Sequence, residues 1–170
     1  MGKLHTTSPK PIEKVTAVAP ELINLYESDY LLWLEATVKL LQEGRINEID
    51  VNNLIEEIEG MSRSERNALF SNLKILLMHL LKYRYQIARR SPSWRSSIRE
   101  HRQRILRDFK NSPSLKPYFT KILGECYQSA RELAADETGL PLVEFPKECP
   151  FSPEEILNTE YLPEIGRAHV

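Results

Sequence analysis

The stretch SRSERNALFSNLKILLMHLLKYRYQ, residues 62–86, decides the fold class of this chain. Its apolar residues recur every three or four positions, which is the period of an α-helix with one buried face. Ser62 and Glu65 form a capping box, so we predict that a helix begins here, after an interruption at Gly60. The apolar face comprises Leu69, Phe70, Leu73, Leu76, Leu77, Leu80 and Leu81.

The same period recurs on both sides of this stretch. We predict further helices that begin at Ser28 or Asp29, at Asp50, at Ser91 or Ser93, near Pro113, and after Ser152. In the first of these helices we expect a stripe of Leu31, Leu34, Val38 and Leu41. The apolar surface is widened by Leu32, Trp33 and Leu40, so we expect this helix to be central in the fold. No long stretch alternates with the period of a strand, and no internal repeat is present. The sequence therefore predicts an all-α protein, an antiparallel up-and-down bundle of four to five helices with an irregular, proline-rich C-terminal segment.

The domain organisation follows from length and local composition. A chain of 170 residues is typical of one domain. Residues 1–24 contain three prolines and no lasting period, so we predict a flexible N-terminal arm there. Residues 25–163 are then a single helical-bundle domain, and residues 164–170 a C-terminal tail.

Composition excludes several classes of protein. Hydrophobic residues make up 41% of the chain and charged residues 28%, with a net charge of −1, which is typical of a globular protein. The N-terminal residues have no signal-peptide pattern, and no apolar run approaches the ~20 residues that cross a bilayer. Cys126 and Cys149 are the two cysteines, expected as free thiols. We expect a cytoplasmic protein with no membrane partner and no cofactor, for which an oligomer remains open.

Five short stretches together carry a family resemblance: LIEEIEGM at residues 54–61, LLMHLLKY at 76–83, RRSPSW at 89–94, ETGL at 137–140 and FPKECPF at 145–151. Over roughly Tyr26 to Pro163 the chain resembles a bacterial family known as domain of unknown function family twenty-nine. The resemblance implies a helical bundle, in agreement with the periodicity. It implies no activity, and therefore no catalytic residue.

A polar seam lies beside the leucine face of residues 62–86. On a helical wheel His79 falls at the margin of that face, with Tyr83 and Gln86 close to it. Other predicted helices place charged residues beside or within their apolar stripes, and a buried ion without a partner costs several kcal/mol. We therefore predict one semi-buried cluster: Glu57, His79, Tyr83, Arg102 and Glu137. This cluster is either a structural network that fixes helix register or a functional pocket in the centre of the bundle.

Basic residues are concentrated in residues 82–110. Ten bases against two acids give +8 there, so the rest of the chain carries −9. Basic residues interleaved with Tyr83, Tyr85 and Trp94 resemble a surface that contacts RNA or DNA. The alternative is a solvated face paired with acidic helices. The candidate nucleic-acid contacts are Arg89, Arg90, Arg95 and Arg99.

Three functions remain open from the sequence. The leading one is a non-enzymatic binding or regulatory module that contacts a nucleic acid or protein partner through the basic helix. RSSIREH at residues 95–101 resembles the Arg-x5-His pattern of helical ribonucleases in toxin–antitoxin modules, with Arg95 and His101 as the catalytic pair. The third is a small-molecule or metal pocket around His79. No spaced Cys and His set and no pair of Glu-x-x-His motifs is present, so we assign no metal ligands.

Overall fold

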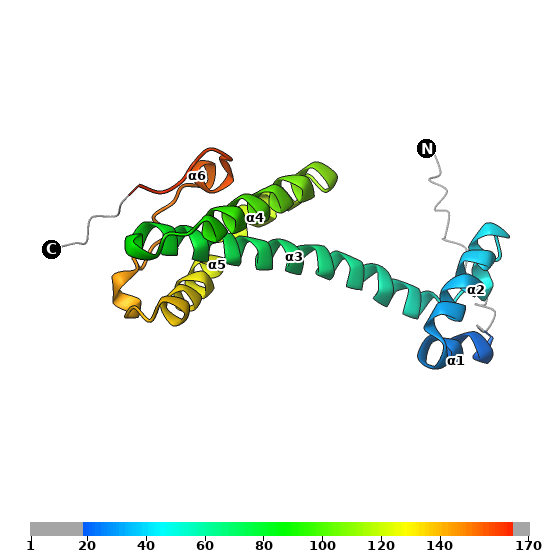
Figure 1. Cartoon of the computed structure of the whole chain (residues 1–170). Helices are drawn as coiled ribbons and strands as arrows, with labels where there is room; N and C mark the ends of the chain where they lie inside the picture. Colours follow the sequence, from blue (N-terminus) through cyan, green and yellow to red (C-terminus); the bar gives the residue numbers. More distant parts are fainter. Residues whose placement is uncertain (1–18, 165–170) are drawn as a thin grey trace, which may run out of the picture. The chain divides into compact units, whose positions relative to one another are not determined.

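The computed structural model describes residues 19–164, and every regular element in this range is helical (Figure 1). The α-helices are α1 (Pro20–Ser28), α2 (Tyr30–Gln42), α3 (Val51–Tyr85), α4 (Pro92–Asn111), α5 (Leu115–Thr138) and α6 (Pro153–Leu157). Short 3₁₀ turns occur at η1 (Ile46–Glu48), η2 (Ile87–Arg89) and η3 (Leu142–Glu144). The predicted all-α fold is confirmed. Within the same residues, none of the helices combines the length and the apolar character that a membrane span requires.

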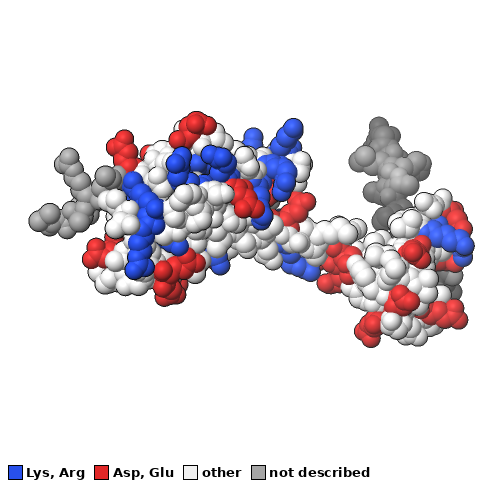
Figure 2. All heavy atoms as spheres, viewed as in Figure 1, with Lys and Arg blue, Asp and Glu red and all other residues white. Residues whose placement is uncertain are grey.

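The chain divides into two compact units, Met1–Met61 and Ser62–Val170. In the described part of the first, residues 19–61, ten acidic residues against two basic ones give a net charge of −8. In residues 62–164 of the second, seventeen basic against thirteen acidic residues give +4. Figure 2 shows this difference as red side chains over α1 and α2 and blue ones gathered over α4. We call these parts the acidic unit and the basic unit. The single domain expected over residues 25–163 stays a prediction.

Two helix boundaries differ from those that the sequence predicts. Residues 20–24, expected in the arm, are helical, because Pro20 suits a first helical turn and Leu22 is buried. The rest of the predicted arm, residues 1–18, lies outside the described residues, as do residues 165–170 of the predicted tail.

The second difference is that α3 is one helix of 35 residues where we expected two. Gly60 lies inside it, and the predicted capping box at Ser62 is not a helix start. A glycine within a helix costs only about 1 kcal/mol. A break would instead leave a second set of backbone N–H and C=O groups without helical partners. The continuous helix therefore prevails.

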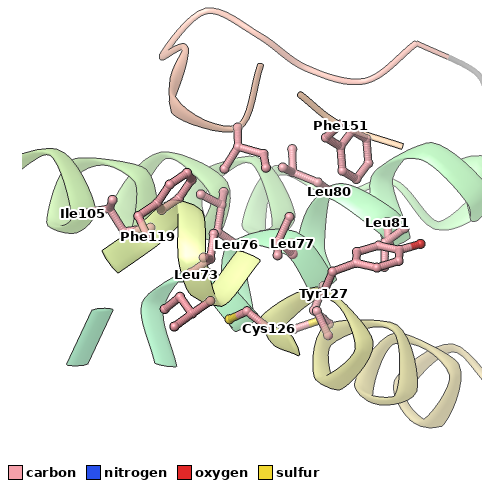
Figure 3. Close-up of a cluster of buried hydrophobic side chains, with 14 of the residues drawn as sticks. Leu73, Leu76, Leu77, Leu80, Leu81, Ile105, Phe119, Cys126, Tyr127 and Phe151 are labelled. Atoms are coloured by element: carbon pink, nitrogen blue, oxygen red, sulfur yellow. The ribbon is translucent and has the colours of Figure 1, made fainter. Parts of the chain in front are cut away.

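The basic unit has a large core, which α3, α4 and α5 form as antiparallel neighbours. Twenty buried hydrophobic residues belong to it among those described. Figure 3 shows Leu76, Leu77 and Leu80 of α3 among side chains from the other elements, including Phe119 of α5 and Phe151 of the C-terminal segment. The leucine face predicted for residues 69–81 is therefore the centre of this core.

The proline-rich C-terminal segment packs onto the basic unit through side chains and through its backbone. Phe145, Phe151 and Ile156 are fully buried in the core. The hydroxyl of Tyr127 donates to the carbonyl of Pro146 at 2.6 Å, and Arg131 Nε donates to the carbonyl of Phe145 at 3.0 Å. Helix α5 thereby binds the first part of the segment, around residues 142–147.

The acidic unit has a much smaller core. Only Leu22, Trp33, Leu40 and Ile49 are buried hydrophobics there. Helix α2 buries Trp33, Thr37 and Leu40 and partly buries Leu34, whereas Leu31, Val38 and Leu41 of the expected stripe are exposed, so the expected stripe is wrong for these three residues. Leu31 is 65% exposed and Val38 50%. The helix has two apolar faces, and its own unit covers only one of them.

Candidate functional site

The five residues predicted as one cluster take part in several separate contacts. Lys82 forms a buried ion pair, although from the sequence it is expected only as one of the bases of residues 82–110. Its Nζ lies 2.6 Å from Oε2 of Glu137 on α5 and 4.6 Å from the centre of the Trp94 ring. The Lys82 side chain is 8% exposed, whereas that of Glu137 is 42% exposed. The pair therefore joins a buried ammonium to a carboxylate that water still reaches.

His79 is half-buried one turn before Lys82. Burial and the nearby Lys82 ammonium lower the pKa of His79 to about 4, against a smaller opposite effect of Glu137. Its Nδ1 is buried and has no hydrogen-bond partner among the described residues. His79 is thus neutral at pH 7. Glu137 is near enough to raise its pKa slightly, but the two side chains form no ion pair.

Arg102 is 1% exposed, and its partners are backbone carbonyls rather than carboxylates. The guanidinium donates to the carbonyl oxygens of Ile156 at 2.7 Å, Tyr161 at 3.1 Å and Glu155 at 3.3 Å. Burial lowers the pKa of Arg102, but the pKa of an arginine starts far enough above neutral that the group stays charged. Its predicted pairing within a carboxylate cluster is wrong, because the C-terminal segment supplies the acceptors.

Glu57 has its partners in the acidic unit. Its carboxylate accepts hydrogen bonds from the hydroxyls of Tyr26, at 2.6 Å, and of Tyr30. These bonds lower the pKa of Glu57 and raise the pKa of Tyr26 to about 12. Glu57 thus connects α3 to α1 and α2.

The aromatic residues interleaved with the bases of residues 82–110 make their contacts within the protein. The Arg90 guanidinium lies 4.3 Å from the centre of the Tyr83 ring, and its Nε donates to the Tyr83 carbonyl at 2.7 Å. Tyr85 packs edge-on against Phe145, at 5.7 Å between ring centres. The Lys82 ammonium lies over the Trp94 ring. These three rings are therefore not arranged for nucleobases to stack on them.

Arg95 and His101, the candidate ribonuclease pair, point to different sides of α4. His101 Nδ1 lies 2.9 Å from Oδ1 of Asn72 on α3, and burial lowers its pKa. Arg95 is exposed and lines a groove with Thr159 and Glu160 of the C-terminal segment. Six positions along an α-helix separate two side chains by about 120°, so this helix does not turn both toward one phosphate.

One face of α4 presents cations without acids. At about 100° per residue, four basic residues fall within roughly 120° of the helix surface: Arg95, Arg99, Arg107 and Lys110. All four are exposed, and none forms an ion pair within residues 19–164. Glu100 lies beyond the edge of this face and pairs with Arg104. We call these four residues the basic face of α4.

No group of three His, Cys, Asp or Glu side chains that could hold a metal ion occurs in the described part of the chain. Glu57, His79 and Glu137, considered as a mixed ligand set, do not form such a group. Cys126 is buried with its thiol directed at the carbonyl of Phe70, and burial raises its pKa to about 12. Neither a metal centre nor a reactive thiol can be built from these residues.

Comparison with known families identifies a relationship for most of the chain. The family model described as domain of unknown function DUF29 matches residues 25–162. The chain belongs to this family. The match covers nearly the same range as the resemblance at Tyr26 to Pro163. No curated protein and no solved structure matches the chain. Family membership therefore confirms the relationship and assigns no activity to this DUF29 chain.

Proposed function

We propose that this protein is a non-enzymatic binding module whose basic face of α4 contacts the phosphate backbone of a nucleic acid. The observation that supports this proposal is the set of four exposed cations on one side of a single helix, with no acid among them. Arg95 and Lys110 are fifteen residues apart, which is about 22 Å along an α-helix. Such a row matches the repeating charge of a nucleic acid strand.

The polar and aromatic surroundings decide the mode of contact. Ser96 and Gln103 lie on the same face and can donate hydrogen bonds to phosphate oxygens. Tyr83 and Trp94 already form cation–π contacts, with Arg90 and Lys82 respectively. We therefore expect contacts to the backbone with little preference for base sequence, because groups that position a backbone carry no sequence information.

The test is binding of fluorescent single-stranded RNA and duplex DNA to the full chain between 50 and 200 mM salt. We expect affinity that falls steeply with salt. The double substitution Arg95→Gln/Arg99→Gln should weaken binding and reduce the slope of log K against log salt by about 1.4 for a single strand, or about 0.7 per lost phosphate contact. Anisotropy titrations at four salt concentrations measure both quantities.

The control removes the same charge elsewhere in the basic unit. Lys121→Gln/Lys147→Gln changes two exposed lysines of α5 and the C-terminal segment. It should leave the salt slope almost unchanged. No salt-dependent binding of either probe, or an equal loss in the control variant, contradicts the proposal.

A further inference from the structure

The acidic unit exposes many large apolar side chains. Of fourteen such exposed residues among those described, eleven belong to residues 19–61, although this part is much the shorter one. Its core has only four buried hydrophobics. A unit of this size is marginally stable when it buries so little of its apolar surface. Its apolar surface is therefore suited to a further helix.

The exposed residues form two stripes with coiled-coil spacing. On α2 the stripe is Leu31, Leu34, Val38 and Leu41, separated by three, four and three positions; Leu34 is partly buried and the other three are exposed. On α3 the stripe is Val51, Ile55 and Ile58, separated by four and three positions. This spacing is that of a seam against which another helix packs. Ile58 is 57% exposed and Leu41 46%, so nothing in the described chain fills these positions.

The two stripes border the same small core. Leu34, which belongs to the first stripe, and Leu54, which neighbours Ile55, both pack against the buried Trp33 group. A helix that lies on either stripe would therefore extend an existing core rather than cover an isolated patch.

Charge selects the occupant. The unit carries −8, and one of its two basic residues, Arg45, is already paired with Glu43 and Glu48. Glu35 is exposed on the flank of the α2 stripe. A second copy that docked through the same stripes would place another acidic unit against this one, and like charges repel. A basic partner gains attraction from the same carboxylates.

We propose that residues 20–61 dock a basic amphipathic helix of a partner protein. Its leucine-type residues pack on the α2 stripe, and its lysines and arginines face Glu35 and the surrounding acids. The apolar residues of the ligand are then at heptad spacing, as in other complexes that bind an amphipathic helix. The site is independent of the basic face of α4, so either proposal can fail without the other.

The test uses the full chain and three synthetic helical peptides of about 22 residues. The first has leucine at heptad positions and lysine at the flanking ones. The second replaces the lysines with glutamate, and the third replaces the leucines with serine. We expect the first alone to bind, as measured by isothermal titration calorimetry. Leu31→Ser/Val38→Ser should weaken that binding at least about tenfold, since two leucine-sized contacts are lost.

Two further variants separate the contributions. Leu142→Ser/Val143→Ser alters exposed apolar residues of the basic unit and should leave peptide affinity unchanged. Glu35→Lys should weaken binding of the lysine peptide several-fold at low salt and less at high salt. Circular dichroism of each variant confirms that the helices are intact, since all of these side chains are exposed.

Three results overturn the proposal. One is equal affinity for the lysine and glutamate peptides. Another is unchanged affinity in Leu31→Ser/Val38→Ser. The last is a dimer of the wild-type chain in sedimentation analysis that the same double substitution dissociates, since a second copy would then occupy the stripes.

Discussion

The acidic and basic units differ in how far they bury the apolar face of a helix. Helix α3 in the basic unit has a leucine face, and α4, α5 and the C-terminal segment bury all of its leucines. Helix α2 in the acidic unit has a comparable leucine stripe, and three of its four residues are exposed. The difference teaches that apolar periodicity specifies a surface for packing, while the available partner decides whether the chain itself supplies it.

Polar contacts differ between the units as well. In the acidic unit, Glu57 receives two tyrosine hydroxyls at a partly exposed position. In the basic unit, Lys82 and Arg102 are buried cations with partners distant in sequence. The acidic unit also buries an acidic side chain, Asp50, but its partner Asn53 is only three residues away. The following predictions test how separate the two units are.

The largest effect is expected for Trp33→Ala. Removing this fully buried ring should cost about 3–5 kcal/mol, more than a four-residue core can sustain, and should unfold the acidic unit. The second tryptophan, Trp94, lies in the basic unit. Its urea unfolding transition, followed by fluorescence, should differ little between Trp33→Ala and the wild type. Leu77→Ala is the control and should shift the Trp94 transition by about 3 kcal/mol. Equal shifts of the Trp94 transition in both variants would show that the two units unfold together as one cooperative domain.

A smaller effect is expected at the Lys82–Glu137 pair, and it should be asymmetric. Glu137→Gln removes the negative charge opposite a buried ammonium and leaves it a neutral amide oxygen and the Trp94 ring, so the free energy of unfolding should fall by about 1–2 kcal/mol. Lys82→Met leaves the carboxylate in contact with water and packs a thioether on the ring, which should cost less. Urea unfolding at pH 7 measures both. The opposite order would show that the buried cation does not need its partner.

The smallest effect at pH 7 is expected for His79, because its contribution develops only as the pH falls. Its pKa is about 4 in the folded protein and about 6.5 in the unfolded chain, so unfolding takes up a proton between these values. Stability should therefore fall as pH falls from 6.5 to 4, by at most about 1.4 kcal/mol per pH unit for this group. His79→Gln should make the dependence shallower. His101 contributes in the same direction, so some slope should remain. An unchanged slope contradicts the assignment.

The sequence was sufficient for the fold class and for most helix ends. Asp29 and Ser91 accept hydrogen bonds from the first turns of α2 and α4, as predicted, and α5 ends at Gly139. It was misleading where two local signals competed. The capping box at Ser62 is a sound local signal, but a helix that is already under way has no need of a new start.

The candidate site was less predictable than the fold. His79 and Glu137 do lie near enough to influence each other, and Tyr83 contacts Arg90 instead. Lys82 was missed, although it follows Ile75 and Met78 at helical spacing, which could have indicated burial. The acceptors of Arg102 are main-chain oxygens of the C-terminal segment, and no residue type in a sequence marks those.

The contacts of Arg102 have a consequence for how the family can vary. Every amino acid offers the same carbonyl oxygen, so replacing the side chain at position 155, 156 or 161 does not remove an acceptor. These three hydrogen bonds thus depend on the side chain of Arg102 and not on the side chains of the segment. The buried side chains of Phe151 and Ile156 are the part of the attachment that a substitution in the segment would disturb.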